Sequence, residues 1–62
     1  MTVREIIKTI ESEGWFLSRQ RGSHRQFKHP TRGGIVTVAG KPSKDLAPKT
    51  VKSIFRQAGM SQ

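Results

Sequence analysis

The chain has 62 residues, a length that predicts one domain over residues 1–62. It contains no cysteine, which excludes a disulfide framework and a thiolate metal site. Because it has no apolar run long enough for a membrane span and no signal-peptide pattern, we expect a cytoplasmic protein that does not act at a membrane.

Basic residues are concentrated in the middle of the chain. Lysine and arginine total 12 against 4 acidic residues, which gives a net charge of +8. No acidic residue stands between Glu13 and Asp45, and this interval contains Arg19, Arg21, Arg25, Lys28, Arg32, Lys41 and Lys44. Such a run of uncompensated cations favours a polyanionic partner. Charge alone leaves both a nucleic acid and an acidic protein open.

The first predicted element is a helix that begins at Thr2. Thr2 and Glu5 form a capping-box pattern, in which each side chain satisfies a free backbone N–H group. The apolar residues recur at helical spacing, at Val3, Ile6, Ile7 and Ile10. Gly14 suits the left-handed conformation that ends a helix, so we expect the helix to stop before it.

Three strands are predicted next, at 15–20, 24–29 and 35–38. A turn at 21–23 joins the first two strands, and the proline and glycines of 30–34 separate the second from the third. The β-branched residues of the third segment are the clearest strand signal in the chain. Because the connections are short, we expect the three strands to form an antiparallel meander.

A second helix is predicted after a loop at 40–47. It begins at Pro48, since a first-turn proline loses no helical hydrogen bond. Its apolar stripe consists of Val51, Ile54, Phe55 and Ala58, and Gly59 ends it. The order α-β-β-β-α predicts an α+β fold in which both helices cover one face of a three-stranded antiparallel sheet. This is the topology of double-stranded-RNA-binding domains, although a fold alone is weak evidence for function.

His24 is the main candidate for chemistry. If Phe27 points into the core, two-residue alternation turns His24, Gln26 and Lys28 away from the helices. Histidine can act as an acid or a base near neutral pH, and the cations of Arg21 and Lys28 would attract a phosphodiester. The alternative interpretation is an exposed histidine without a chemical role.

The turn before His24 is a candidate phosphate contact. Gly22 would let backbone amides approach a phosphate, and the Ser23 hydroxyl would donate a hydrogen bond to it; the alternative is an ordinary hairpin turn. A serine nucleophile is not expected, because the only aspartate, Asp45, lies in a loop that need not approach Ser23. Arg25 is a further candidate for binding the polyanion, and the same alternation places it on the side of Phe27.

The second histidine and two aromatic residues near the strands are expected to have structural or contact roles. His29 should lie on the face opposite His24, so we expect a structural role for it and not a two-histidine mechanism. Trp15 is expected in the core, and Phe16 should point the other way as an exposed aromatic contact. Two histidines with scattered acids lack metal-ligand spacing, so neither a metal site nor a cofactor is expected.

Several of these segments together resemble the HicA-type toxins of bacterial toxin–antitoxin pairs. The resemblance covers Gly14-Trp15, Arg19, Gly22-Ser23-His24, Gly33-Gly34, Val36-Thr37-Val38 and the segment from Thr50 to Gly59. It implies the double-stranded-RNA-binding fold and a ribosome-independent mRNA interferase whose single active-site histidine corresponds to His24. It also implies a HicB-type antitoxin that blocks the active site and often represses the shared operon. Direct DNA binding is expected only through that antitoxin.

The chain departs from one common version of this pattern. Many HicA-type toxins carry a histidine shortly after the third strand, whereas this chain has Ala39-Gly40-Lys41-Pro42 there. A mechanism that uses a second histidine from this segment is therefore not expected. We expect metal-independent RNA cleavage that depends on His24, with Arg21, Arg25 and Lys28 binding the RNA chain. Two alternatives stay open: an RNA-binding module without catalysis, and a basic interaction domain for an acidic partner protein.

Overall fold

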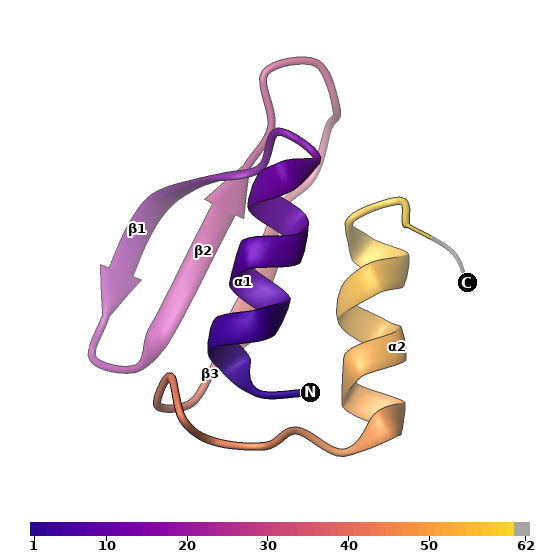
Figure 1. The fold of residues 1–62 in the computed structure, drawn as a ribbon. Helices are drawn as coiled ribbons and strands as arrows, with labels where there is room; N and C mark the ends of the chain where they lie inside the picture. Colours follow the sequence, from indigo (N-terminus) through magenta and orange to yellow (C-terminus); the bar gives the residue numbers. More distant parts are fainter. Residues whose placement is uncertain (61–62) are drawn as a thin grey trace.

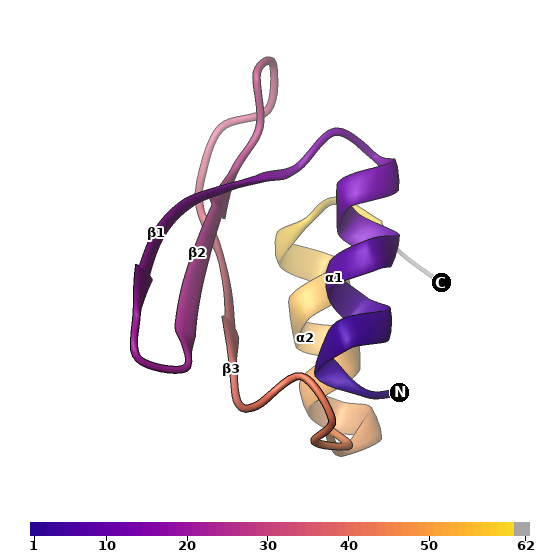
Figure 2. The same cartoon turned by 60° about the vertical axis from the view of Figure 1, so that its left-hand side comes forward.

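Two helices pack against one face of a three-stranded sheet in the computed structural model, which describes residues 1–60 (Figure 1, Figure 2). The elements are α1 (Val3–Ser12), β1 (Phe16–Arg21), β2 (His24–Lys28), β3 (Val36–Ala39) and α2 (Pro48–Gln57). The strands are antiparallel in the order β1-β2-β3. This confirms the predicted α+β fold of the double-stranded-RNA-binding type, with strand boundaries within one residue of the predicted ones.

Helix α1 begins with the predicted capping box. The backbone N–H of Glu5 donates to Thr2 Oγ1 at 3.2 Å, and the backbone N–H of Thr2 donates to Glu5 Oε1 at 2.8 Å. The hydrogen bonds from the Thr2 backbone and then from its side chain lower the pKa of the Glu5 carboxyl. The helix ends at Ser12, and Gly14 follows with φ of 99°. Local sequence therefore fixes both ends of α1.

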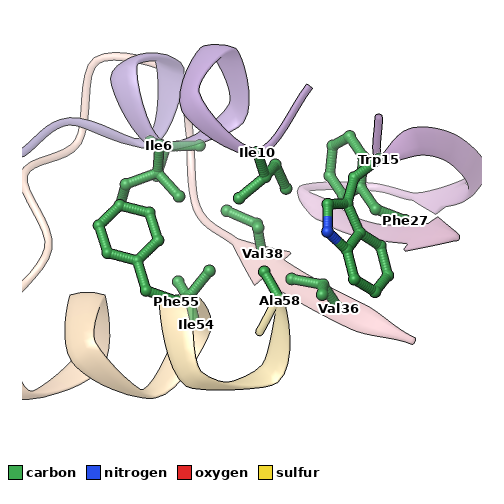
Figure 3. Packing of buried hydrophobic residues seen from close by; sticks show 10 residues of the cluster. Ile6, Ile10, Trp15, Phe27, Val36, Val38, Ile54, Phe55 and Ala58 are labelled. Carbon is green, nitrogen blue, oxygen red and sulfur yellow. The ribbon is translucent and has the colours of Figure 1, made fainter. Parts of the chain in front are cut away.

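The core lies between the helices and the sheet (Figure 3). It consists of Val3, Ile6 and Ile10 from α1, Trp15, Phe27 from β2, Val36 and Val38 from β3, Ile54 and Phe55 from α2, and Ala58. Both helices contact β3. In contrast, every residue of β1 is exposed. The sheet thus has a helix-covered face, centred on β2 and β3, and an open face.

Among residues 1–60, neither helix has the length and apolar character that crossing a lipid bilayer requires.

Candidate functional site

His24 lies at the start of β2 on the open face of the sheet. Phe27, three residues further on, is 1% exposed and points into the core, so alternation turns His24 to the other side. The side chain of His24 is exposed, and its cross-strand partners are Arg21 on β1 and Ala39 on β3. The predicted orientation of His24 is confirmed.

A β-bulge in β1 determines where its arginines point. Leu17 is paired with Phe27 and therefore shares the helix-side face, and strict alternation would place Arg19 and Arg21 on that same face. The register shifts between Leu17 and Arg19, which inserts one extra residue at this point of the strand. As a result Arg19 is paired with Gln26, and Arg21 with His24. Both arginines therefore lie on the open face.

These side chains surround a shallow depression on the open face. Its volume is about 420 Å³, and it is lined by Arg19, Arg21, His24 and Gln26. The lining thus combines one imidazole and two guanidinium groups with a neutral amide, and none of its four residues is acidic. Such a site suits a phosphate group, because arginine matches phosphate oxygens with planar paired donors. Arg19 and Gln26 are not among the site residues predicted from the sequence.

Of the other residues predicted to contact RNA, Gly22 and Ser23 lie beside this depression and Lys28 lies away from it. Gly22 and Ser23 form the turn between β1 and β2; Gly22 has φ of 58°, and both residues are exposed. The Ser23 carbonyl accepts a hydrogen bond from the Gly40 N–H at 3.1 Å, which ties this turn to the end of β3. Lys28 shares the open face with His24 but stands at the far end of β2, roughly 13 Å away at about 3.3 Å per residue.

Arg25 is not brought together with the other candidate residues. It is paired with Val38, whose side chain is fully buried, and therefore lies on the helix-side face. Its Nη1 donates to the Gly40 carbonyl at 3.1 Å, and the side chain is partly buried. The guanidinium of Arg25 thus connects β2 to the loop after β3, on the side of the sheet opposite the depression.

His29 holds three segments of the chain together. Its Nδ1 accepts hydrogen bonds from the backbone N–H groups of Thr31 and Arg32, at 3.1 and 3.2 Å. Nε2 therefore carries the proton and donates to the Glu13 carbonyl at 2.8 Å. The ring also meets Trp15 edge-on, with centroids 5.2 Å apart. With both nitrogens engaged far from His24, His29 has the structural position that alternation predicted.

Substitution of Gly14 is expected to damage this arrangement. A Cβ at Gly14 would lie 2.7 Å from His29 Nε2, and the φ of 99° is itself unfavourable for other residues. Gly14→Ala should therefore lower the free energy of unfolding by about 1–3 kcal/mol, measured by urea denaturation. Gly33→Ala is the matched control, because Gly33 has open space around it and no positive φ. Equal stability of the two variants would contradict the role given to Gly14.

Within residues 1–60, no group of three or more histidine, cysteine, aspartate or glutamate residues is placed to hold a metal ion. The candidate site is lined by arginine, histidine and glutamine side chains, which are groups able to bind an anion and, at the imidazole, to transfer a proton.

The fold and this site define a class: a small α+β protein of the double-stranded-RNA-binding type that presents a histidine among arginines on an open sheet. Comparison with known families matches residues 3–60 to the HicA toxin of bacterial toxin–antitoxin systems. The chain therefore belongs to the HicA toxin family, as its sequence motifs predicted, and membership implies an antitoxin partner. A search among curated proteins gave no match.

Proposed function

We propose that this toxin is an mRNA endoribonuclease in which His24 is the catalytic residue. The observation that carries the proposal is the exposed imidazole of His24 beside Arg19 and Arg21 in one depression without acidic lining residues. Membership of the HicA toxin family supports the same reading, since that family is known for mRNA-cleaving toxins. The proposed activity is independent of the ribosome and of a metal ion.

His24 acts as the general base in this proposal. It removes the proton of a ribose 2′-hydroxyl, whose oxygen attacks the adjacent phosphorus while the bond to the 5′-oxygen breaks. The product is a cyclic phosphate, and the departing 5′-oxygen takes up a proton from water. Arg19 and Arg21 stabilise the negative charge that builds up on the phosphate oxygens during this step. Gly22 and Ser23 form the hairpin turn between Arg21 and His24, and so lie next to the reacting phosphate in this proposal.

His24 supplies the only imidazole among the residues that line the depression, so no second imidazole is available to this mechanism. Ala39 is the β3 neighbour of His24, and the segment that follows it contains no histidine. His29 uses both ring nitrogens for contacts with the backbone on the other side of the sheet. The proposed mechanism therefore assigns proton abstraction to His24 alone.

We further propose a HicB-type antitoxin as the partner that neutralises the toxin. Such an antitoxin would cover the open face, because occupying the depression removes RNA access to His24. The excess of cations on this face favours an acidic contact surface on the antitoxin.

The activity is tested by incubating the purified chain with labelled mRNA in the presence of a chelator. Appearance of fragments with cyclic phosphate ends supports the proposal. Binding of intact RNA without fragments would instead support an RNA-binding module without catalysis. Tight binding of an acidic antitoxin with no RNA binding at low salt would support a basic interaction domain.

Arg21 is expected to contribute directly to RNA binding. Arg21→Ala should weaken binding and reduce the slope of log K against log salt by about 0.7, the value for one lost contact with a single strand. Lys52→Ala is the control, because it removes one positive charge from α2 in the helix layer. Filter binding at several salt concentrations measures both slopes. A slope change of the same size in both variants would show that only net charge matters.

A further inference from the structure

Phe16 exposes an aromatic ring on the open face of the sheet. It is the first residue of β1, and its side chain is 47% exposed. Its cross-strand partner is Lys28, which follows His24 and Gln26 in alternation along β2. Phe16 therefore shares the face of His24, as alternation predicted for an exposed aromatic contact. The exposed ring and the ammonium group of its cross-strand partner thus lie at the opposite end of this face from the hairpin turn.

The open face carries three successive rows of cross-strand neighbours, which we call the open-face track. The rows are Phe16 and Lys28, then Arg19, Gln26 and Thr37, then Arg21, His24 and Ala39. The track thus runs from an aromatic–lysine pair through hydrogen-bonding groups to the candidate catalytic histidine. It contains no acidic residue, and both helices lie on the other side of the sheet (Figure 2).

This combination matches the way proteins hold single-stranded nucleic acids. Aromatic side chains stack on bases, and neighbouring cations follow the backbone phosphates. A base is free to stack on a protein ring only when it is unpaired and out of a helix. Phe16 is the only aromatic side chain among the strand residues of this face, since Leu17 is aliphatic and shares the helix-side face with Phe27. Ile35, directly before β3, is 48% exposed and continues the register opposite Lys28 on the open face. Phe16 and Ile35 are separated by Lys28 and so do not form the contiguous patch that an apolar protein surface needs, whereas one ring beside a cation fits a base and its phosphate.

We propose that Phe16 and Lys28 form a subsite for one unpaired RNA base upstream or downstream of the cleaved bond. The Phe16 ring stacks on the base, and the Lys28 ammonium group holds an adjoining phosphate. Lys28 stands roughly 13 Å from His24, too far for the nucleotide attacked at His24 to be the one stacked at Phe16. This inference rests on the proposed RNA cleavage at His24 and specifies its substrate as single-stranded RNA.

The test measures RNA binding in a His24→Ala background, so that cleavage does not interfere. The probe is a short fluorescein-labelled RNA without secondary structure, followed by fluorescence anisotropy. Phe16→Ala should weaken binding about 5- to 160-fold, the equivalent of one lost stacked base, and Phe16→Trp should restore it. Leu17→Ala is the matched control: Leu17 is adjacent and 46% exposed, but it lies on the other face. Its affinity should equal that of the parent.

A second arm locates the stacked base. In a series of RNAs with one abasic position each, one position should weaken binding to the parent but not to Phe16→Ala. A fully paired duplex should bind equally to both. The inference is overturned if Phe16→Ala binds the single strand like the parent, if Leu17→Ala loses as much affinity, or if every abasic penalty persists in Phe16→Ala.

The outcome separates this inference from the proposed function. Cleavage by the unsubstituted chain with no dependence of binding on Phe16 overturns the subsite alone. Binding that depends on Phe16 in a chain that cleaves no RNA supports the subsite and overturns the catalytic proposal.

Discussion

Replacing His24 by alanine is expected to lower the rate of RNA cleavage by about 10²- to 10⁴-fold, the usual contribution of one general acid–base group. The substitution removes the only imidazole that lines the depression. It leaves Arg19 and Arg21 in place, so RNA binding should persist while the chemical step fails. The measurement is the cleavage of labelled mRNA under single-turnover conditions, which separates chemistry from binding.

The fold should tolerate this change. The His24 side chain is exposed, and surface substitutions usually alter stability by no more than about 0.5 kcal/mol. Circular dichroism and urea denaturation of His24→Ala should therefore match those of the parent. His29→Ala provides the contrast, since it removes hydrogen bonds to the Glu13 carbonyl and to the Thr31 N–H and should lower stability. Cleavage at the parental rate by folded His24→Ala would refute the assigned role of His24.

Replacing Phe27 by alanine is expected to remove a large part of the free energy of unfolding of the protein. Phe27 is 1% exposed and packs in the core from the central strand β2 (Figure 3). Truncating a buried phenylalanine costs about 3–5 kcal/mol. A chain of this length has a total stability of only about 3–9 kcal/mol, at about 0.05–0.15 kcal/mol per residue. The loss is therefore comparable to the whole stability of the fold.

The measurement is thermal unfolding followed by circular dichroism, in which Phe27→Ala should show a strongly lowered or absent cooperative transition. Phe16→Ala is the control: it removes the same side chain from the exposed face of β1 and should change stability by no more than about 0.5 kcal/mol. Equal melting temperatures for Phe27→Ala and Phe16→Ala would show that β2 is not anchored as described.

Phe27 also links stability to the proposed activity. Its burial sets which side of β2 faces the helices, and so turns His24 to the open face. A slip of one residue in the pairing of β2 would place His24 against the helices. The hydrophobic anchor and the candidate catalytic residue are thus two consequences of one alternating pattern.

Sequence alone determined the features that depend on residues close together in the chain. The capping box of Thr2 and Glu5, the proline start of α2 and the helical apolar stripes are local signals, and each was confirmed. The alternation from His24 to Phe27 is equally local, since successive strand residues point to opposite sides. The sequence therefore sufficed to predict the fold and the exposure of the candidate histidine.

Tertiary structure alone decided that Arg19 joins Arg21 beside that histidine and that Arg25 is used elsewhere in the fold. The bulge between Leu17 and Arg19 reverses the alternation of β1, and a bulge is defined only by the partner strand. Arg25 is one residue from His24, yet it bonds to the Gly40 carbonyl on the other face. Strand pairing brings distant residues together, so the composition of the site could not be read from one strand at a time.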